Sequence, residues 1–304
     1  MPISPSSLHC GPAGWSYPHW NGVVYPKAKP RGFHPLDFLA GFFDSVEINT
    51  SFYQPLKPEL TRLWATKVAR NPNFQFTAKL HHRFTHDRVL DPSEISAFKE
   101  GLWPLLRGRK LGALLMQFPW SFRFTPENRE FFILLRRAFH EFPLVAEMRH
   151  DSWMLDEALG TFIDYRVGFC NIDQPEYTRA MPPTAFLTSS IGYVRLHGRN
   201  PANALGAFKS DAPRNRQHDY LYDQHEIARW TANIERIGRN AERVFVIANN
   251  DPGGKSVVNS LQFQRALGDT RLLAPSQLRD RYRDILMDFR TRGAEQQRLL
   301  FQAA

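Results

Sequence analysis

Short apolar runs alternate with longer polar or helix-like segments along almost the whole chain. Eight runs have the length of strands, and we expect strands at residues 8–14, 45–49, 74–80, 112–118, 144–149, 167–173, 192–197 and 243–249. Strands that alternate with helices in this way are typical of α/β proteins with a parallel sheet. Eight such units predict a TIM-type (β/α)8 barrel with outer helices, a fold that takes roughly 250 residues before insertions.

The segments between these runs carry helix signals. Residues 125–142 begin with Thr125 as the expected N-cap and Pro126 at the first helical position. The long connection after the seventh strand, residues 198–230, becomes helix-like only near Asp223. A loop of this length is usually functional or disordered. No repeat or linker divides the sequence, so we expect one domain over residues 1–304, with a peripheral tail from about residue 288 as a charged helix or frayed end.

Most of the expected strands end in residues that ionise or form hydrogen bonds. These residues are Glu47, Asn49, Lys79, Gln117, Glu147, Arg149, His150, Asp173, Arg195, His197, Asn249 and Asn250. The carboxyl ends of barrel strands converge on the face where active sites are built. Charged residues also mark the point where any strand enters water. Several of these, however, lie within apolar runs, where burying a charge is costly without a partner or ligand.

The chemistry of this set leaves alternatives open. Glu47 and Glu147 could form a pair for acid and base catalysis, or each could neutralise an arginine, with Glu147 pairing with Arg149 or Arg195. The set Glu47, Glu147, His150, Asp173 and His197 also has the ligand types that divalent metals take. The neighbouring cations would repel a metal ion, so we expect no metal and no other cofactor.

The positive residues suit an anion instead, because arginine binds phosphate or carboxylate through two parallel hydrogen bonds. We therefore expect a small anionic or phosphorylated ligand at this face. Glu47, Glu147 and His197 are the candidate catalytic residues of a hydrolase or other acid–base enzyme. The other strand-end residues are candidates for binding the substrate.

The stretch NNDPGGKS, residues 249–256, ends like a nucleotide-binding P-loop. That motif needs a glycine where Asn249 stands, so the pattern excludes a P-loop NTPase. Gly253 and Gly254 still allow backbone N–H groups to approach an anion at a helix N-terminus. We expect Ser256 to cap that helix and an anion to bind between this loop and Arg195, with Lys255 in solvent; the alternative is a plain helix start.

Aromatic and basic residues add a second function class. Trp15, Tyr17 and Tyr53 follow the first two strands and could stack on a sugar or base, or hold the loops in place. The basic stretch HHRFTHDR, residues 81–88, could contact a phosphate backbone or form a solvated turn. The net charge of +9 favours anionic partners in general. A nucleic-acid-binding or endonuclease-like protein is therefore the alternative to a small-molecule enzyme.

The two cysteines, Cys10 and Cys170, both lie in apolar runs, and two cysteines make no disulfide framework or zinc-finger spacing. The first residues lack the basic and apolar segments of a secretory signal, and no apolar run approaches the ~20 residues of a membrane span. We therefore expect a cytoplasmic protein with no membrane partner. The pattern does not set the oligomeric state.

A series of blocks resembles a known family in order and over nearly the whole chain. The blocks are CGPAGWSYPHWNGVVYP, SVEINTSFYQP, FTAKLHHRFTH, LGALLMQFPWSF, VAEMRHDSW, YVRLHGRN, DYLYDQHE and VFVIANNDPGGKSVVNS. They resemble the DUF72 family, also called YecE-like proteins. The resemblance implies a TIM-barrel fold and an activity that is not established, with a nucleic-acid-linked role suggested from similarity to barrel endonucleases.

Overall fold

A closed barrel of parallel strands forms the centre of the protein. The computed structural model describes residues 7–200 and 218–291. The strands lie in the order β1-β8-β7-β6-β5-β4-β3-β2, and β1 returns to β2 where Gly14 N donates to Glu47 O at 2.9 Å. The strands are β1 (Leu8–Pro12), β2 (Ser45–Ile48), β3 (Gln75–Lys79), β4 (Leu111–Gln117), β5 (Leu144–Glu147), β6 (Gly168–Asp173), β7 (Ile191–Leu196) and β8 (Arg243–Ala248). The predicted TIM-type barrel and its eight strands are confirmed.

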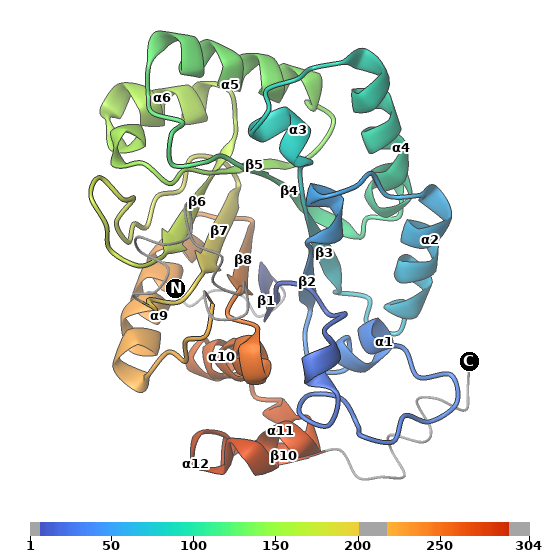
Figure 1. The fold of residues 1–304 in the computed structure, drawn as a ribbon. Helices are drawn as coiled ribbons and strands as arrows, with labels where there is room; N and C mark the ends of the chain where they lie inside the picture. The colour runs from blue at the N-terminus through green and yellow to red at the C-terminus, as the bar shows by residue number, and fades with distance from the viewer. Residues whose placement is uncertain (1–6, 201–217, 292–304) are drawn as a thin grey trace.

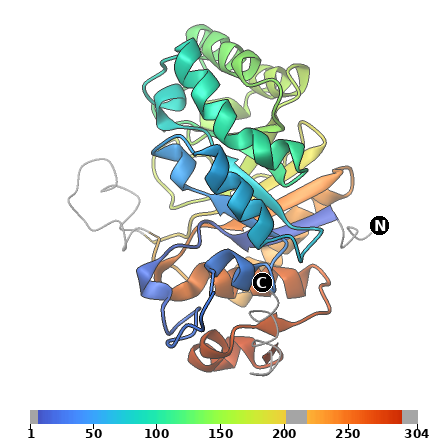
Figure 2. The same ribbon diagram turned by 90° about the vertical axis from the view of Figure 1, so that its right-hand side faces the viewer.

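Helices surround this sheet (Figure 1), and α2 and α4 lie side by side against it in the view of Figure 2. The helices are α1 (Pro35–Leu39), α2 (Pro58–Lys67), α3 (His82–Thr85), α4 (Pro92–Arg107), α5 (Pro126–Ala138), α6 (Asp156–Asp164), α9 (Gln224–Gly238), α10 (Lys255–Ala266), α11 (Ser276–Arg281) and α12 (Arg283–Leu286). Short 3-10 helices are η2 (Pro18–Trp20), η3 (Thr50–Phe52), η4 (Asp151–Met154) and η5 (Pro252–Gly254). In the described part of the chain, every helix is too short or too polar to cross a lipid bilayer.

Local sequence signals explain where several helices begin. Thr125 caps α5 by accepting a hydrogen bond from Asn128 N at 3.3 Å. Asp223 and Glu226 form a capping box at the start of α9, which confirms that the long connection becomes helical at this point. Its residues 201–217 lie outside the described part of the chain.

The expected cap at Ser256 is wrong. A cap at Ser256 would start the helix at Val257, but helix α10 begins two residues earlier, at Lys255, and its N-cap is Gly254 in the left-handed conformation with φ of 77°. Two successive left-handed glycines, Gly253 and Gly254, turn the chain directly into the helix. Ser256 therefore lies inside the first turn, where it is fully buried.

The tail expected from residue 288 is described only at its start. Strand β10 (Arg290–Thr291) pairs in parallel with β9 (Leu273–Ala274), so these two residues are neither helical nor frayed. Residues 292–304 lie outside the described part of the chain.

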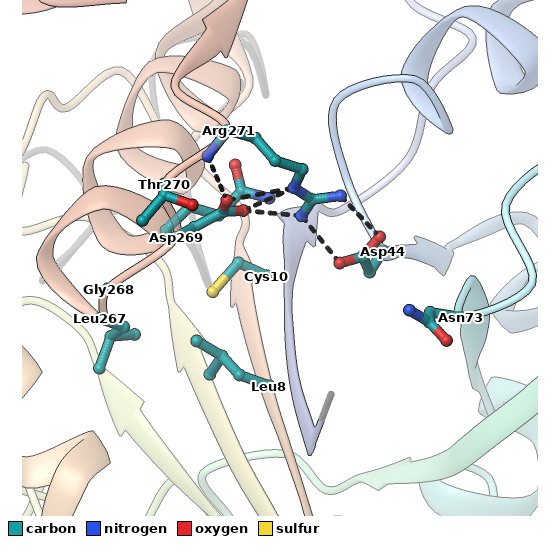
Figure 3. A pocket seen from close by; sticks show the side chains of 10 residues that line it. Leu8, Cys10, Asp44, Asn73, Leu267, Gly268, Asp269, Thr270 and Arg271 are labelled. Atoms are coloured by element: carbon teal, nitrogen blue, oxygen red, sulfur yellow. Dashed lines mark hydrogen bonds and ion pairs between the residues drawn. The ribbon is translucent and has the colours of Figure 1, made fainter. Parts of the chain in front are cut away.

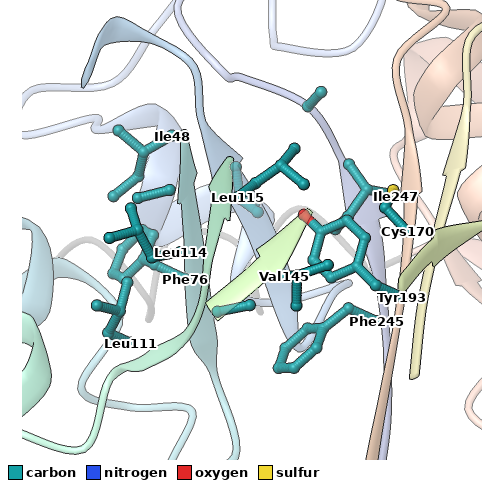
Figure 4. Packing of buried hydrophobic residues seen from close by; sticks show 14 of the residues in the cluster. Ile48, Phe76, Leu111, Leu114, Leu115, Val145, Cys170, Tyr193, Phe245 and Ile247 are labelled. Carbon is teal, nitrogen blue, oxygen red and sulfur yellow. The ribbon is translucent and has the colours of Figure 1, made fainter. Parts of the chain in front are cut away.

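Alternation along the strands separates the barrel interior from the layer under the helices. Thr77 and Tyr193 point inward, because the Tyr193 hydroxyl lies 2.9 Å from Thr77 Oγ1. The inward positions two residues further on are Lys79 and Arg195. Figure 4 shows the Tyr193 ring in the space enclosed by the strands, together with other buried side chains. The same two-residue period therefore carries Lys79 and Arg195 to the C-terminal end of the interior.

We expect Gly11→Ala to destabilise the barrel. A Cβ atom at Gly11 would lie 1.8 Å from Ser45 O, at the point where β1 approaches β2. Forcing the strands apart costs about 1–3 kcal/mol or more. The matched control is Gly160→Ala in α6, where a Cβ meets no atom within 4 Å; alanine there stabilises by roughly 0.5–1 kcal/mol. Urea unfolding measures both changes, and equal unfolding midpoints for the two variants would contradict this explanation of barrel closure.

Candidate functional site

Arg195 occupies the centre of a buried ionic cluster at the C-terminal end of the barrel. Its Nη2 lies 2.7 Å from Glu47 Oε1, and its Nη1 lies 3.1 Å from Glu147 Oε2. Arg195 is 2% exposed and both carboxylates are fully buried. Burial opposes the charge of Arg195, but the two carboxylates outweigh it and raise its pKa. The alternative that each glutamate neutralises an arginine is therefore the arrangement that the structure has.

Arg149 and His197 extend this cluster towards the barrel mouth. Arg149 Nη2 lies 2.6 Å from Glu147 Oε1, as an ion pair without the alignment of a hydrogen bond. Burial favours the neutral acid at Glu147, but Arg149, Arg195 and His197 outweigh it and hold its pKa well below the usual range. His197 Nε2 lies 3.1 Å from Arg149 Nη2. Burial and the neighbouring arginine charges keep His197 neutral by lowering its pKa.

Lys79 is the cation of this site that lacks a carboxylate partner. Its Nζ lies 4.0 Å from the centre of the Phe52 ring. Among the described residues, no acceptor forms a hydrogen bond or ion pair with this amine, and Lys79 is 7% exposed. Burial, followed by the charge of Arg195, lowers the pKa of Lys79 from 10.5 to about 7. Lys79 is thus a partly desolvated amine that gains or loses its proton near neutrality.

The positive charges of the site also lower the pKa values of His86 and His218, after burial as the main cause. The sequence did not identify these two histidines as site residues. Burial and then the charge of Lys79 lower the pKa of His86 to about 4. Burial also lowers the pKa of His218 to about 4, with Arg195, Arg149 and Lys79 acting in the same direction. His86 lies in the basic stretch of residues 81–88. His218 follows a segment with no periodic pattern, so no local signal identifies it.

The other strand-end residues divide into two groups. Gln117 Oε1 accepts a hydrogen bond from Arg195 Nη1 at 3.2 Å, and the Asn249 amide lies 3.1 Å from His197 Nδ1. These two join the cluster. Asp173 instead accepts hydrogen bonds from Arg199, His150 Nδ1 accepts one from Ser152 N, and the Asn250 amide donates to Tyr220 O and Asn259 Oδ1.

The set of possible metal ligands is therefore not assembled around one point. Asp173 and His150 have partners of their own, while Glu47 and Glu147 face Arg195. Within residues 7–200 and 218–291, no group of three or more His, Cys, Asp or Glu side chains is arranged to hold a metal ion.

Carboxylates of the same chain lie beside the NNDPGGKS loop and balance the positive charge of its Lys255. Asp251 lies two residues before the first of the glycines, and His19 lies 3.3 Å from its carboxylate. Lys255 forms an ion pair with Asp219, so it is not a free cation in solvent. The negative charge of Asp219 also contributes to raising the pKa of Asp251, whose main cause is burial. Two nearby carboxylates make this loop a poor place for an anion, and Arg195 is occupied by its own glutamates.

An aromatic pocket opens beside the cluster. Its volume is about 420 Å³, and its lining is Gly14, Trp15, Ser16, Tyr17, Asn49, Thr50, Tyr53 and Trp64. Trp15 packs edge-on against Trp64 at 4.9 Å between ring centres, whereas Tyr53 is 57% exposed. Asn49 Oδ1 is buried and has no hydrogen-bond partner among the described residues. The pocket thus combines aromatic walls with an unused polar atom.

A second pocket of about 510 Å³ lies at the opposite end of the barrel, near the start of β1. Figure 3 shows Arg271 between Asp44 and Asp269, with ion pairs of 2.9 and 2.7 Å. The charge of this arginine is already balanced by two carboxylates. The N-terminal face of a barrel mainly supports stability, so we place the candidate site at the other face.

Comparison with known proteins decides the family. The sequence profile described as "Protein of unknown function DUF72" matches residues 9–281. The chain belongs to the DUF72 family. It is 28% identical over 291 residues to the UPF0759 protein YunF of Bacillus subtilis strain 168, covering 89% of this chain and 99% of YunF.

Solved structures of DUF72 proteins have the same fold. The one from Thermotoga maritima MSB8 is 29% identical with a TM-score of 0.74, covering 86% of this chain and 98% of that one. The one from Enterococcus faecalis V583 is 26% identical with a TM-score of 0.74, covering 86% and 95%.

In this DUF72 protein, we expect Arg195→Met to cost about 3–5 kcal/mol of unfolding free energy, because it leaves the buried Glu47 carboxylate without its arginine and Glu147 with Arg149 alone. Adding Glu47→Gln removes the uncompensated charge and recovers most of the loss. The control is Arg271→Met, an arginine with two carboxylate partners but a side chain 47% exposed, for which the cost is about 1 kcal/mol or less. Urea unfolding of each variant measures these losses of unfolding free energy. Equal losses for the two single variants would show that burial of the cluster is unimportant.

Lys79 also makes stability depend on pH. Its folded-state pKa of about 7 lies below the ordinary 10.5, so the unfolded chain binds more protons between these values, and stability rises with pH across that window. Below pH 7 the penalty of burying the ammonium is fully present. We expect Lys79→Met to be more stable than the wild type at pH 6, with the difference shrinking from pH 7 to 10. A constant difference between the two proteins over this range, measured by urea unfolding, would refute this titration.

Proposed function

We propose that this protein is a barrel enzyme that binds a small anionic or phosphorylated substrate at the C-terminal mouth. The excess of positive charge carries the proposal: among the residues that the structure describes, Lys79, Arg149 and Arg195 act on one another here, and the carboxylates that act on Lys79 are Glu47 and Glu147. An unpaired buried ammonium is costly. A bound anion would supply the missing partner.

The geometry favours distinct roles for these residues. The Arg149 side chain is 19% exposed, against 2% for Arg195, so Arg149 is the arginine that faces a ligand. Glu47 and Glu147 both pair with Arg195, so they act as positioning residues rather than as the acid and base expected from the sequence. Lys79 suits proton transfer better, because an acid–base group works best when its pKa lies near the working pH.

The alternative function, binding of nucleic acid, fits this site less well. The unpaired cation is 7% exposed at the end of β3, whereas backbone phosphates are usually met by an exposed basic face. A recessed charge favours a ligand small enough to enter the mouth. The net charge of +9 attracts polyanions in general and does not distinguish the two functions.

We expect inorganic phosphate to bind the wild type in calorimetry at pH 6.5, and Arg149→Met and Lys79→Met each to weaken this binding about tenfold or more, since each removes a charge-assisted contact. Lys255→Met is the matched control, because Lys255 already pairs with Asp219, and its affinity stays at the wild-type value. Circular dichroism of each variant verifies that it is folded.

Two results would count against this proposal. One is the same phosphate affinity in all four proteins. The other is binding of a short DNA duplex that is stronger than binding of phosphate and that falls steeply between 50 and 200 mM salt, as release of counterions requires. That second result would favour the nucleic-acid alternative.

A further inference from the structure

The environment of Lys79 differs from that of a lysine that serves only to bind an anion. Its Nζ has an aromatic ring on one side and no hydrogen-bond acceptor among the described residues. Lysines that serve only as charges are usually solvated or paired, whereas a desolvated amine next to other cations gains nucleophilic character. Arg149 and Arg195 are the cations that act on Lys79 here.

Resting on the proposed function, we propose that Lys79 is the nucleophile that forms an imine with a small aldehyde or ketone carrying a carboxylate or phosphate group. Arg149 would bind the anionic group, and the carbonyl carbon would then lie at the end of β3. The neutral amine that this reaction needs is present near pH 7, where the pKa of Lys79 lies.

The chemical step is balanced without an oxidant or reductant. The lone pair of the neutral Lys79 Nζ attacks the carbonyl carbon, and one N–H proton passes from the nitrogen to the carbonyl oxygen to give a carbinolamine. The hydroxyl group then takes up one proton from solvent and leaves as water, while the lone pair of the nitrogen forms the second bond to carbon, which gives the protonated imine. The protonated imine withdraws electrons from the adjacent carbon, so a bond at that carbon can break with its electron pair held in an enamine.

The surroundings support a substrate of this size. Segment η3 carries Phe52, whose ring contacts Lys79. Thr50, the first residue of this segment, and Tyr53, which directly follows it, line the aromatic pocket of about 420 Å³. A small substrate held at Lys79 therefore has an aromatic pocket next to it for the part that does not react.

The test is reductive trapping with sodium cyanoborohydride at pH 7. The wild type is incubated separately with pyruvate, dihydroxyacetone phosphate and uncharged dihydroxyacetone, and the modified lysines are located by peptide mass spectrometry. We expect Lys79 to be labelled at least about tenfold faster than any other lysine by an anionic probe, because ordinary lysines are almost fully protonated at this pH. Lys79→Arg abolishes the fast label, Lys255→Arg leaves it unchanged, and inorganic phosphate slows it in the wild type.

The outcomes separate this proposal from the one on which it rests. Labelling of Lys79 at the rate of surface lysines by both anionic probes overturns the imine, and if Arg149→Met still weakens phosphate binding, the anion site stands without it. Fast labelling of Lys79 by dihydroxyacetone and its phosphate at equal rates keeps the nucleophile and overturns the anion site. Because the wild type carries the main measurement, a poorly folding variant does not obscure the result.

Discussion

The ion pairs of a buried arginine with two buried carboxylates hold together the C-terminal end of this barrel. Arg195 reaches Glu47 from β2 and Glu147 from β5, so one side chain connects strands from three parts of the barrel wall. Tyr193, two residues earlier, donates a further hydrogen bond to Glu47 Oε2 at 2.9 Å. Interiors of such barrels are usually filled by branched apolar side chains. Here the stability of the interior at the C-terminal end of the barrel depends on charge balance. Removing one partner would leave an uncompensated charge in a medium that solvates it poorly.

The same pairing determines which groups remain available for a ligand. Glu47 pairs with Arg195, and Glu147 pairs with Arg195 and Arg149, so neither carboxylate forms an ion pair with Lys79. Burial, and after it the positive charge around the mouth, lowers the pKa values of Lys79, His86 and His218. A bound anion would oppose the contribution of the positive charge. The proposed anion binding would therefore be coupled to proton affinity at this mouth, as linkage requires.

In two other regions, the glycine loop before α10 and the opposite end of the barrel, the positive side chains already have carboxylate partners. The glycine loop before α10 has Asp251 and Asp219 beside it, and Lys255 is paired with Asp219. At the opposite end of the barrel, Arg271 is paired with Asp44 and Asp269. In both places the chain supplies the counter-charge itself. The C-terminal mouth differs, because within residues 7–200 and 218–291 no carboxylate forms an ion pair with the Lys79 ammonium group.

The sequence by itself determined the fold, because the alternation of strand-length apolar runs with helical segments reflects local burial, and burial repeats at every βα unit. It also placed Glu47, Lys79, Glu147, Arg149, Arg195 and His197 at the carboxyl ends of strands, where parallel topology brings them to one face. Only the tertiary structure decided which charge pairs with which. Arg195 and Glu47 are 148 residues apart in the chain, and no local pattern encodes such a contact. In the structure both glutamates pair with Arg195, Asp173 and His150 have other partners, and no described carboxylate pairs with Lys79. Pairing and desolvation depend on distances across the barrel rather than on neighbours in sequence.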